Sequence, residues 1–91
     1  MTFPEALAHL LDYRVMQRVD GDQCYNFWFN KDTGSGMYEE DAYKFASMWF
    51  VSIDDFTANN WEFADEASET RIKEKYGDSH RYVKGIGLAR R

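Results

Sequence analysis

Apolar and polar residues recur along this chain with two different periods, and the changes of period divide it into helices and strands. Residues 3–12 carry apolar side chains at helical spacing. Thr2 and Glu5 have the spacing of a capping box, and Pro4 stands in the first turn, where its missing amide is harmless. The sequence therefore predicts a helix over residues 3–12. Its apolar stripe consists of Phe3, Ala6, Leu7, Leu10 and Leu11.

Two segments with a period of two follow, over residues 13–19 and 23–30, and turn-forming residues 20–22 lie between them. In the first segment one face carries Val15 and Val19, and the other carries Arg14, Met16 and Arg18. In the second segment one face carries Tyr25, Phe27 and Phe29, and the other carries Cys24, Asn26, Trp28 and Asn30. The pattern predicts an antiparallel hairpin.

The middle of the chain is less regular. Residues 31–36 form a loop whose glycines lack the lysine and serine or threonine pair of a P-loop, so no phosphate cradle is expected. Residues 38–47 mix acidic residues that favour a helix start with aromatic residues that favour a strand. We expect a short helix or an irregular lead-in there. Residues 47–51 are apolar on both faces, which predicts a central strand.

The clearest local signal comes directly after this predicted strand. Ser52 and Asp55 have the layout of a capping box, which predicts a short helix. We expect Phe56 on the inner face of this helix, and residues 59–60 are asparagines that tolerate the left-handed geometry of a helix end. A strand over residues 61–63 is then predicted.

The C-terminal part has high helical propensity over residues 65–76, where Glu69 and Lys73 pair one turn apart. Gly77 is expected to end this helix, and residues 82–83 to add a short strand.

Together these elements predict a single α+β domain over residues 1–91. Its antiparallel sheet carries an N-terminal helix and a short helix before the last core strand. A chain of 91 residues buries only about 60–65% of its unfolded surface, so association with other copies would stabilise it.

Charge is distributed unequally along the chain. Residues 1–70 carry 14 acidic and 4 basic side chains, a net charge of −10, whereas residues 71–91 carry 2 acidic and 7 basic side chains, a net charge of +5. The acidic body disfavours direct binding to duplex DNA, because affinity for a polyanion comes largely from lysine and arginine. Residues 66–91 are expected to form a basic helical tail that folds back on the body, or an arm that binds a partner or a nucleic acid.

The cellular setting is inferred from cysteine usage and hydropathy. A single cysteine, Cys24, excludes an intramolecular disulfide and suits a reducing cytoplasm. We expect neither a membrane span nor a signal peptide, because no long apolar run and no basic segment with an apolar core is found.

Candidate catalytic groups are few. His9 and His80 stand in unrelated segments, and Cys24 has no marked base near it in sequence. The adjacent carboxylates of residues 39–41 and 54–55 are of a kind common at helix starts. We therefore predict neither an enzyme nor a metal or cofactor site.

Binding is the favoured class of function, because aromatic residues make up 18% of the chain. An aromatic face stacks on a nucleobase for about 1–3 kcal/mol, and the arginine fork suits phosphate. The same rings could instead form the core of a small sheet. The candidates are Tyr25, Trp28, Trp49 and Trp61, with Arg14 and Arg18.

Three motifs of the chain carry a resemblance. They are Thr2-Phe3-x-Glu5-Ala6-Leu7-x-x-Leu10, the basic strand from Arg14-Val15 to Arg18, and Ser52-x-x-Asp55-x-x-Ala58-x-Asn60-Trp61-Glu62. Through them residues 1–65 resemble the Thoeris anti-defence two family of phage proteins, and the last motif is the most specific.

The resemblance implies a small α+β protein that assembles into oligomers. It also implies that cyclic nucleotide signals of bacterial immunity are held between the subunits and are not hydrolysed. Some relatives are linked to inhibition of CRISPR effectors, so the resemblance also allows a function in protein binding. The chain departs from the family after the basic strand, where a Gly-Trp pair is usual: residues 19–23 contain no tryptophan, and the next one is Trp28. The basic tail after Arg71 also lies outside the pattern.

Two main hypotheses follow. The first is a phage counter-defence protein, in the host cytoplasm, that sequesters a cyclic nucleotide as a homo-oligomer. Its predicted ligand-binding residues are Arg18, Trp28, Asp55, Asn60 and Trp61. The second is an anti-CRISPR protein or another inhibitor of a bacterial defence protein, whose acidic surface, with residues 39–41, imitates phosphates. A structural or regulatory phage protein without a small ligand is a third option.

Overall fold

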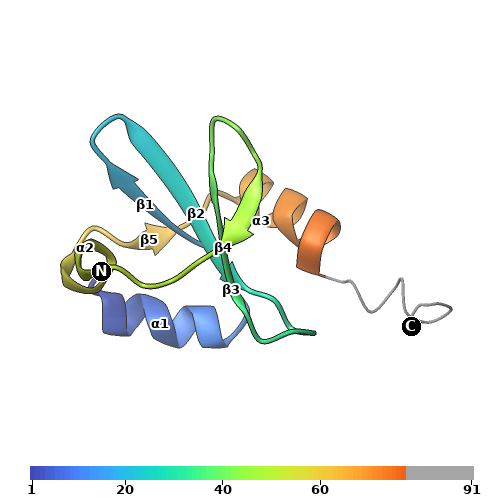
Figure 1. The fold of residues 1–91 in the computed structure, drawn as a ribbon, viewed down its shortest axis with the longest axis horizontal. Coiled ribbons are helices and arrows are strands. Elements are labelled where there is room, and N and C mark those ends of the chain that lie inside the picture. The colour runs from blue at the N-terminus through green and yellow to red at the C-terminus, as the bar shows by residue number, and fades with distance from the viewer. Residues whose placement is uncertain (78–91) are drawn as a thin grey trace, which may run out of the picture.

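The computed structural model describes residues 1–77, which form an α+β domain with helices on both faces of one antiparallel sheet (Figure 1). The helices are α1 (Phe3–Leu11), α2 (Ile53–Thr57) and α3 (Glu66–Ile72), and a π-helical turn, η1 (Lys73–Gly77), continues α3. The strands are β1 (Met16–Asp20), β2 (Gln23–Phe29), β3 (Gly36–Glu40), β4 (Ala46–Met48) and β5 (Glu62–Phe63).

The strand order is β4-β3-β2-β1-β5, and every neighbouring pair is antiparallel. The predicted α+β class, with its N-terminal helix and a short helix before the last strand, is confirmed. None of the helices within residues 1–77 is long and apolar enough to cross a membrane. The predicted strand over residues 82–83 and most of the basic tail lie outside the described residues.

Helix α1 covers one face of the sheet and is specified by local signals. The capping box between Thr2 and Glu5 is formed, and Pro4 lies in the first turn. Phe3, Ala6 and Leu10 of its apolar stripe are buried, as predicted. The stripe ends earlier than expected, because Leu11 is 62% exposed at the last position of the helix.

The central strand β2 separates two apolar clusters because its side chains alternate between the faces. Phe27 packs into the cluster that includes α1, whereas its neighbour Trp28 packs against Val15 and Ile72 on the other face. Ile72 belongs to α3, so α1 and α3 cover opposite faces; in Figure 1, α1 lies below the strands and α3 at the upper right. The faces predicted for β1 and β2 are therefore confirmed.

The middle of the chain differs from the prediction. Residues 36–40, expected as loop and lead-in, form strand β3, and the strand expected over residues 47–51 is the shorter β4. This strand lies at an edge of the sheet and not at its centre. In the apolar run of residues 48–51, Trp49 is buried, whereas Met48, Phe50 and Val51 are exposed, Phe50 to 79%. The double-sided apolar pattern therefore indicated one core ring and exposed apolar surface, and not double burial.

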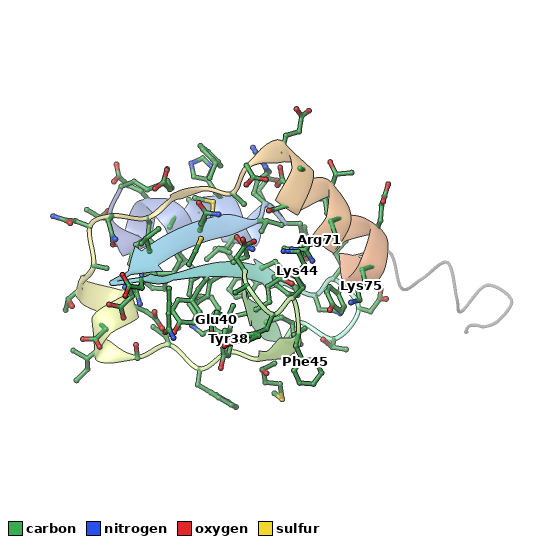
Figure 2. All side chains as sticks on the ribbon, turned by 90° about the horizontal axis from the view of Figure 1, so that it is seen from above. Tyr38, Glu40, Lys44, Phe45, Arg71 and Lys75 are labelled. Atoms are coloured by element: carbon green, nitrogen blue, oxygen red, sulfur yellow. The ribbon has the colours of Figure 1, made fainter. Side chains whose placement is uncertain are left out.

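A buried ion pair explains how an acidic segment forms strand β3. Glu39 is fully buried beneath α3, and its carboxylate accepts hydrogen bonds from both terminal nitrogens of Arg71 and from Nδ2 of Asn26 at 3.0 Å. Figure 2 shows Arg71 reaching from α3 over the strands. The expectation that residues 39–41 form one acidic surface is thus wrong for Glu39, whose charge is compensated inside the domain.

We predict that Arg71→Met destabilises the domain by about 3 kcal/mol, because it leaves the Glu39 carboxylate buried without its counter-charge. The matched control is Lys75→Met on the exposed side of the adjoining η1 turn, which should change the free energy of unfolding by less than about 0.5 kcal/mol. Urea unfolding of both variants measures the difference. Equal stability of the two variants would show that the ion pair does not hold α3 to the sheet.

Candidate ligand-binding groove

A buried ion pair joins β1 to α2 on the face of the sheet that α1 covers in part. Arg18 Nη2 donates to Asp55 Oδ1 at 2.6 Å, and both side chains are about 8% exposed. Arg18 faces this side because it alternates with Val19 along β1, and Asp55 does so because it is the third residue of α2. The ion pair thereby holds together β1 and α2, through two residues that are 37 positions apart in the sequence.

Asp55 is the centre of a larger hydrogen-bond network. Its Oδ2 accepts from Trp49 Nε1 and from the backbone N–H of Ser52, both at 3.0 Å, and its backbone carbonyl accepts from Trp61 Nε1 at 3.0 Å. The guanidinium carbon of Arg18 lies 5.6 Å from the centre of the Trp61 ring, a cation–π contact. The carboxylate of Asp55 thus orients Arg18 and Trp49, and its backbone carbonyl orients Trp61.

Burial of Asp55 acts to raise its pKa, but the hydrogen bonds from Trp49, Ser52 and Arg18 act in the opposite direction and outweigh it. The pKa of Asp55 therefore lies below its ordinary value of 3.8. A carboxyl group with a lowered pKa stabilises the folded state above its unfolded-state pKa, and this stabilisation is lost as the pH falls through the folded-state pKa.

The side chain that helix α2 buries is not the one that the sequence predicted. The capping box of Ser52 and Asp55 is formed as expected. Asp55 is the buried residue of α2, whereas Phe56 is 63% exposed and only touches the ring of Phe3. The reason is that the inward position faces the Arg18 guanidinium and the Trp49 indole N–H, which a carboxylate satisfies and a phenyl ring does not.

A groove of about 340 Å³ opens beside this network, between the sheet and the segment that runs from β4 into α2. Aromatic rings of Tyr25, Tyr38, Trp49 and Phe50 line it, together with Arg18 and Asp55. The Nε of Arg18 is buried and has no hydrogen-bond partner within residues 1–77. An unpaired donor on a nine-tenths buried side chain marks a place where a ligand acceptor would be stabilised.

The groove also carries negative charge. Asp20 and Asp54 line it and are exposed, and the charge of Arg18 is offset by Asp55. This combination suits a ligand with planar rings and N–H or O–H donors, and it offers one buried donor to an oxygen of the ligand. No group of three or more potential metal ligands occurs within residues 1–77.

Four of the five predicted site residues lie in or next to this network. Arg18, Asp55 and Trp61 are in contact, and Asn60 holds the adjoining segment by donating from Nδ2 to the carbonyl of Val19 at 2.8 Å. Trp28 lies on the opposite face of the sheet, where its ring stacks on Tyr76 at 5.3 Å. The structure therefore does not bring Trp28 together with the other four.

Sequence reasoning did not select seven of the residues that line the groove. They are Asp20, Phe27, Tyr38, Met48, Phe50, Ser52 and Asp54. The apolar run of residues 48–51 next to a capped helix contains a signal for Phe50, but the same run also predicts a core strand. The side of Tyr38 could not be assigned while β3 was not recognised as a strand.

Comparison with known proteins identifies no family: no protein-family model, no curated protein and no solved structure matches this chain. The function is therefore argued from the groove and from the sequence motifs.

We predict that Asp55→Asn destabilises the domain by about 3 kcal/mol at neutral pH, because Arg18 stays buried without a counter-charge. The difference from the wild type should shrink as the pH falls below about 4, because the unfolded wild type then binds a proton at Asp55, whereas the folded protein does so only at its lower pKa. Urea unfolding between about pH 3 and pH 7 measures this. Asp54→Asn, one residue away and exposed, is the control and should leave stability unchanged. A penalty for Asp55→Asn that does not vary with pH would contradict the assignment of the charge.

Proposed function

We propose that this protein is a phage counter-defence protein that binds a cyclic nucleotide signal of bacterial immunity and withholds it without cleaving it. The observation that supports this function most is the groove itself, whose lining combines the nine-tenths buried Arg18 with several aromatic rings. The resemblance of residues 1–65 to the Thoeris anti-defence two family points to the same function.

The lining of the groove suits the parts of a nucleotide. A base can stack on the exposed ring of Phe50 or on Tyr38, with about 1–3 kcal/mol for each stacked base. The Nε of Arg18 can donate to a phosphate or ribose oxygen. The carboxylates of Asp20 and Asp54 can accept from amino groups of a base, as aspartate does from cytosine. They also disfavour a phosphate placed beside them, so we place the phosphates at the Arg18 end.

A second copy of the chain would complete the site. The groove of about 340 Å³ is near the lower end of the range for ligand pockets, about 300–1,000 Å³. Large apolar side chains are exposed beside it, in the segment from β4 through α2, and they form a surface here called the apolar rim. The rim consists of Met48, Phe50, Val51, Ile53 and Phe56. Such a patch is typical of an interface, and we propose that it forms the contact of a homo-oligomer.

We predict that Phe50→Ala weakens binding of a cyclic nucleotide at least about tenfold, because one stacked base is lost. Phe45→Ala is the matched control: Phe45 is 76% exposed, does not line the groove and projects from the outer edge of the β3–β4 hairpin in Figure 2. Calorimetric titration of both variants with a panel of cyclic nucleotides measures the effect. Equal affinities of the two variants would remove the groove as the binding site.

We predict that Ile53→Glu converts the oligomer to a monomer, because it puts a charge into the centre of the apolar rim, where Ile53 is 80% exposed. Leu11→Glu is the control, since Leu11 is also exposed but lies at the far end of α1. Sedimentation velocity distinguishes the two. A wild-type protein that is already monomeric at high micromolar concentration would contradict the proposed interface.

The exposed carboxylates of the groove favour one second candidate function. Asp20 and Asp54 could receive the lysine or arginine side chains of a bacterial defence protein, for example at the nucleic-acid channel of a CRISPR effector. In that case the panel of cyclic nucleotides gives no binding, and the double variant Asp20→Asn/Asp54→Asn loses inhibition while it keeps its fold.

A further inference from the structure

Helix α3 covers only one half of its face of the sheet. The strand residues that pack against it are Val15 and Trp28, with Met37 and Ala46 beside them. Strands β1 and β2 continue past this cluster to their hairpin turn, which stands at the upper left of Figure 1, away from α3. The part of the face beyond the cluster is here called the open face. Its side chains are those of Gln17, Val19, Cys24, Asp41 and Glu62.

The strand register brings these five side chains together. Val19 is paired with Cys24, and the backbone N–H of Asp41 donates to the carbonyl of Cys24 at 2.7 Å, so these three residues form one row. Gln17 is paired with Glu62 and belongs to the next row. Side chains two positions apart along a strand lie on the same face. Both rows therefore continue the face that α3 covers.

The open face has no apolar cover within residues 1–77. Val19 is 42% exposed, Glu62 is exposed, and the other three side chains are half-buried. Neither of the two apolar clusters of this part of the chain includes Val19 or Cys24. A sheet face that carries apolar side chains is normally buried against another element. The open face thus offers room for one more segment.

The open face and its border are rich in carboxylates. Asp41 and Glu62 belong to it, and Asp65, the N-cap residue of α3, lies at its border. Burial raises the pKa of the Cys24 thiol, and the negative charges of these three carboxylates raise it further. The three charges therefore act on the same place in the middle of the open face.

Two cations border the open face but do not balance it. The guanidinium of Arg71 is engaged with the buried carboxylate of Glu39. Lys44 Nζ donates to the backbone carbonyl of Asp41 at 2.8 Å and offsets one charge. Three carboxylates and one ammonium group leave this surface with a net charge of −2.

Residues 78–91 have the opposite charge. They carry four basic side chains and one acidic side chain, a net charge of +3. Apolar residues stand between the basic ones. The basic residues are Arg81, Lys84, Arg90 and Arg91, and the large apolar ones are Tyr82, Val83, Ile86 and Leu88. Such a segment can place cations beside carboxylates and apolar side chains over Val19 and Cys24.

The place where the described chain ends is close enough for this contact. The ring of Tyr76 stacks on Trp28 with 5.3 Å between the ring centres, and Gly77 follows directly. Trp28 and Cys24 are four positions apart on β2, which is about 13 Å. The 14 residues after Gly77 can span up to about 46 Å. They can therefore reach the whole open face of the same molecule.

We propose that the open face is the docking site of the chain's own residues 78–91, whose basic side chains lie beside its carboxylates and whose apolar side chains cover Val19 and Cys24. The docked segment neutralises this part of the acidic body. It also occupies the basic residues, so that they are not available to an anionic partner.

The docking site is separate from the groove. Arg18 and Tyr25 line the groove, and they alternate along β1 and β2 with Val19 and Cys24 of the open face. The two surfaces therefore lie on opposite faces of the hairpin. The proposal does not depend on what the groove binds, so its failure would leave the proposed function untouched.

The test follows the backbone amide signals of the full-length protein in ¹H–¹⁵N correlation spectra. In the double variant Arg81→Glu/Lys84→Glu, the signals of Val19 and Cys24 should shift from their wild-type positions, because the segment leaves the open face. The double variant Lys31→Glu/Lys75→Glu is the control, since it changes the charge equally at exposed positions outside the open face. It should leave both signals in place.

A synthetic peptide of residues 78–91, added to the Arg81→Glu/Lys84→Glu variant, should return the two signals toward their wild-type positions in a saturable manner. Glu62→Lys, introduced into this variant, should weaken binding of the peptide at least about threefold. Asp32→Lys makes the same charge change in the exposed loop after β2 and should leave the affinity unchanged.

Four results would overturn the proposal. The first is that the signals of Val19 and Cys24 do not respond to the tail variant. The second is that the signals of Ser52 and Asp54 in the groove respond in their place. The third is that Glu62→Lys and Asp32→Lys weaken binding of the peptide equally, which would indicate attraction by net charge alone. The fourth is that the wild-type signal positions change on dilution, which would assign the contact to a second copy.

Discussion

The candidate groove depends on one buried carboxylate. Asp55 neutralises a guanidinium that β1 carries into the interior, fixes the indole N–H groups of Trp49 and Trp61, and caps its own helix through Ser52. Each of these groups would be costly to bury without a partner. Because they come from β1, from the segment after β4 and from the residue before β5, one residue joins three parts of the chain: its carboxylate binds Arg18 and Trp49, and its backbone carbonyl binds Trp61.

On the other face of the sheet, a second buried carboxylate is also compensated by an arginine. Glu39 enters the sheet beneath α3 and is compensated by Arg71 and Asn26. Arg14 and the backbone N–H of Val15 add a second attachment through Glu69, with Arg14 Nε 2.8 Å from the carboxylate. A small acidic domain thus keeps two of its carboxylates inside and directs others, such as Asp20 and Asp54, toward the groove. The two faces remain chemically distinct.

The elements that could be predicted from the sequence are those specified by neighbouring residues. The capping boxes at Thr2 and Ser52 and the alternation along β1 and β2 act within a few positions, and all of them are present. Strand β3 could not be predicted, because burial of Glu39 depends on Arg71, 32 positions away. In the same way, the inward turn of Asp55 instead of Phe56 depends on Arg18. Four predicted site residues lie close together because Asp55, Asn60 and Trp61 belong to one sequence motif and Arg18 lies on the adjacent strand β1. Trp28 was predicted from its aromatic ring alone, and it lies on the other face of the sheet.

The central claim is that the groove holds a cyclic nucleotide and releases it unchanged. Native mass spectrometry of the purified protein mixed with a panel of cyclic nucleotides, followed by denaturation and analysis of the released molecules, tests it most directly. The account predicts an oligomer that carries a cyclic nucleotide and returns it intact. A monomer that retains no nucleotide, or an oligomer that releases a linearised product, would contradict it.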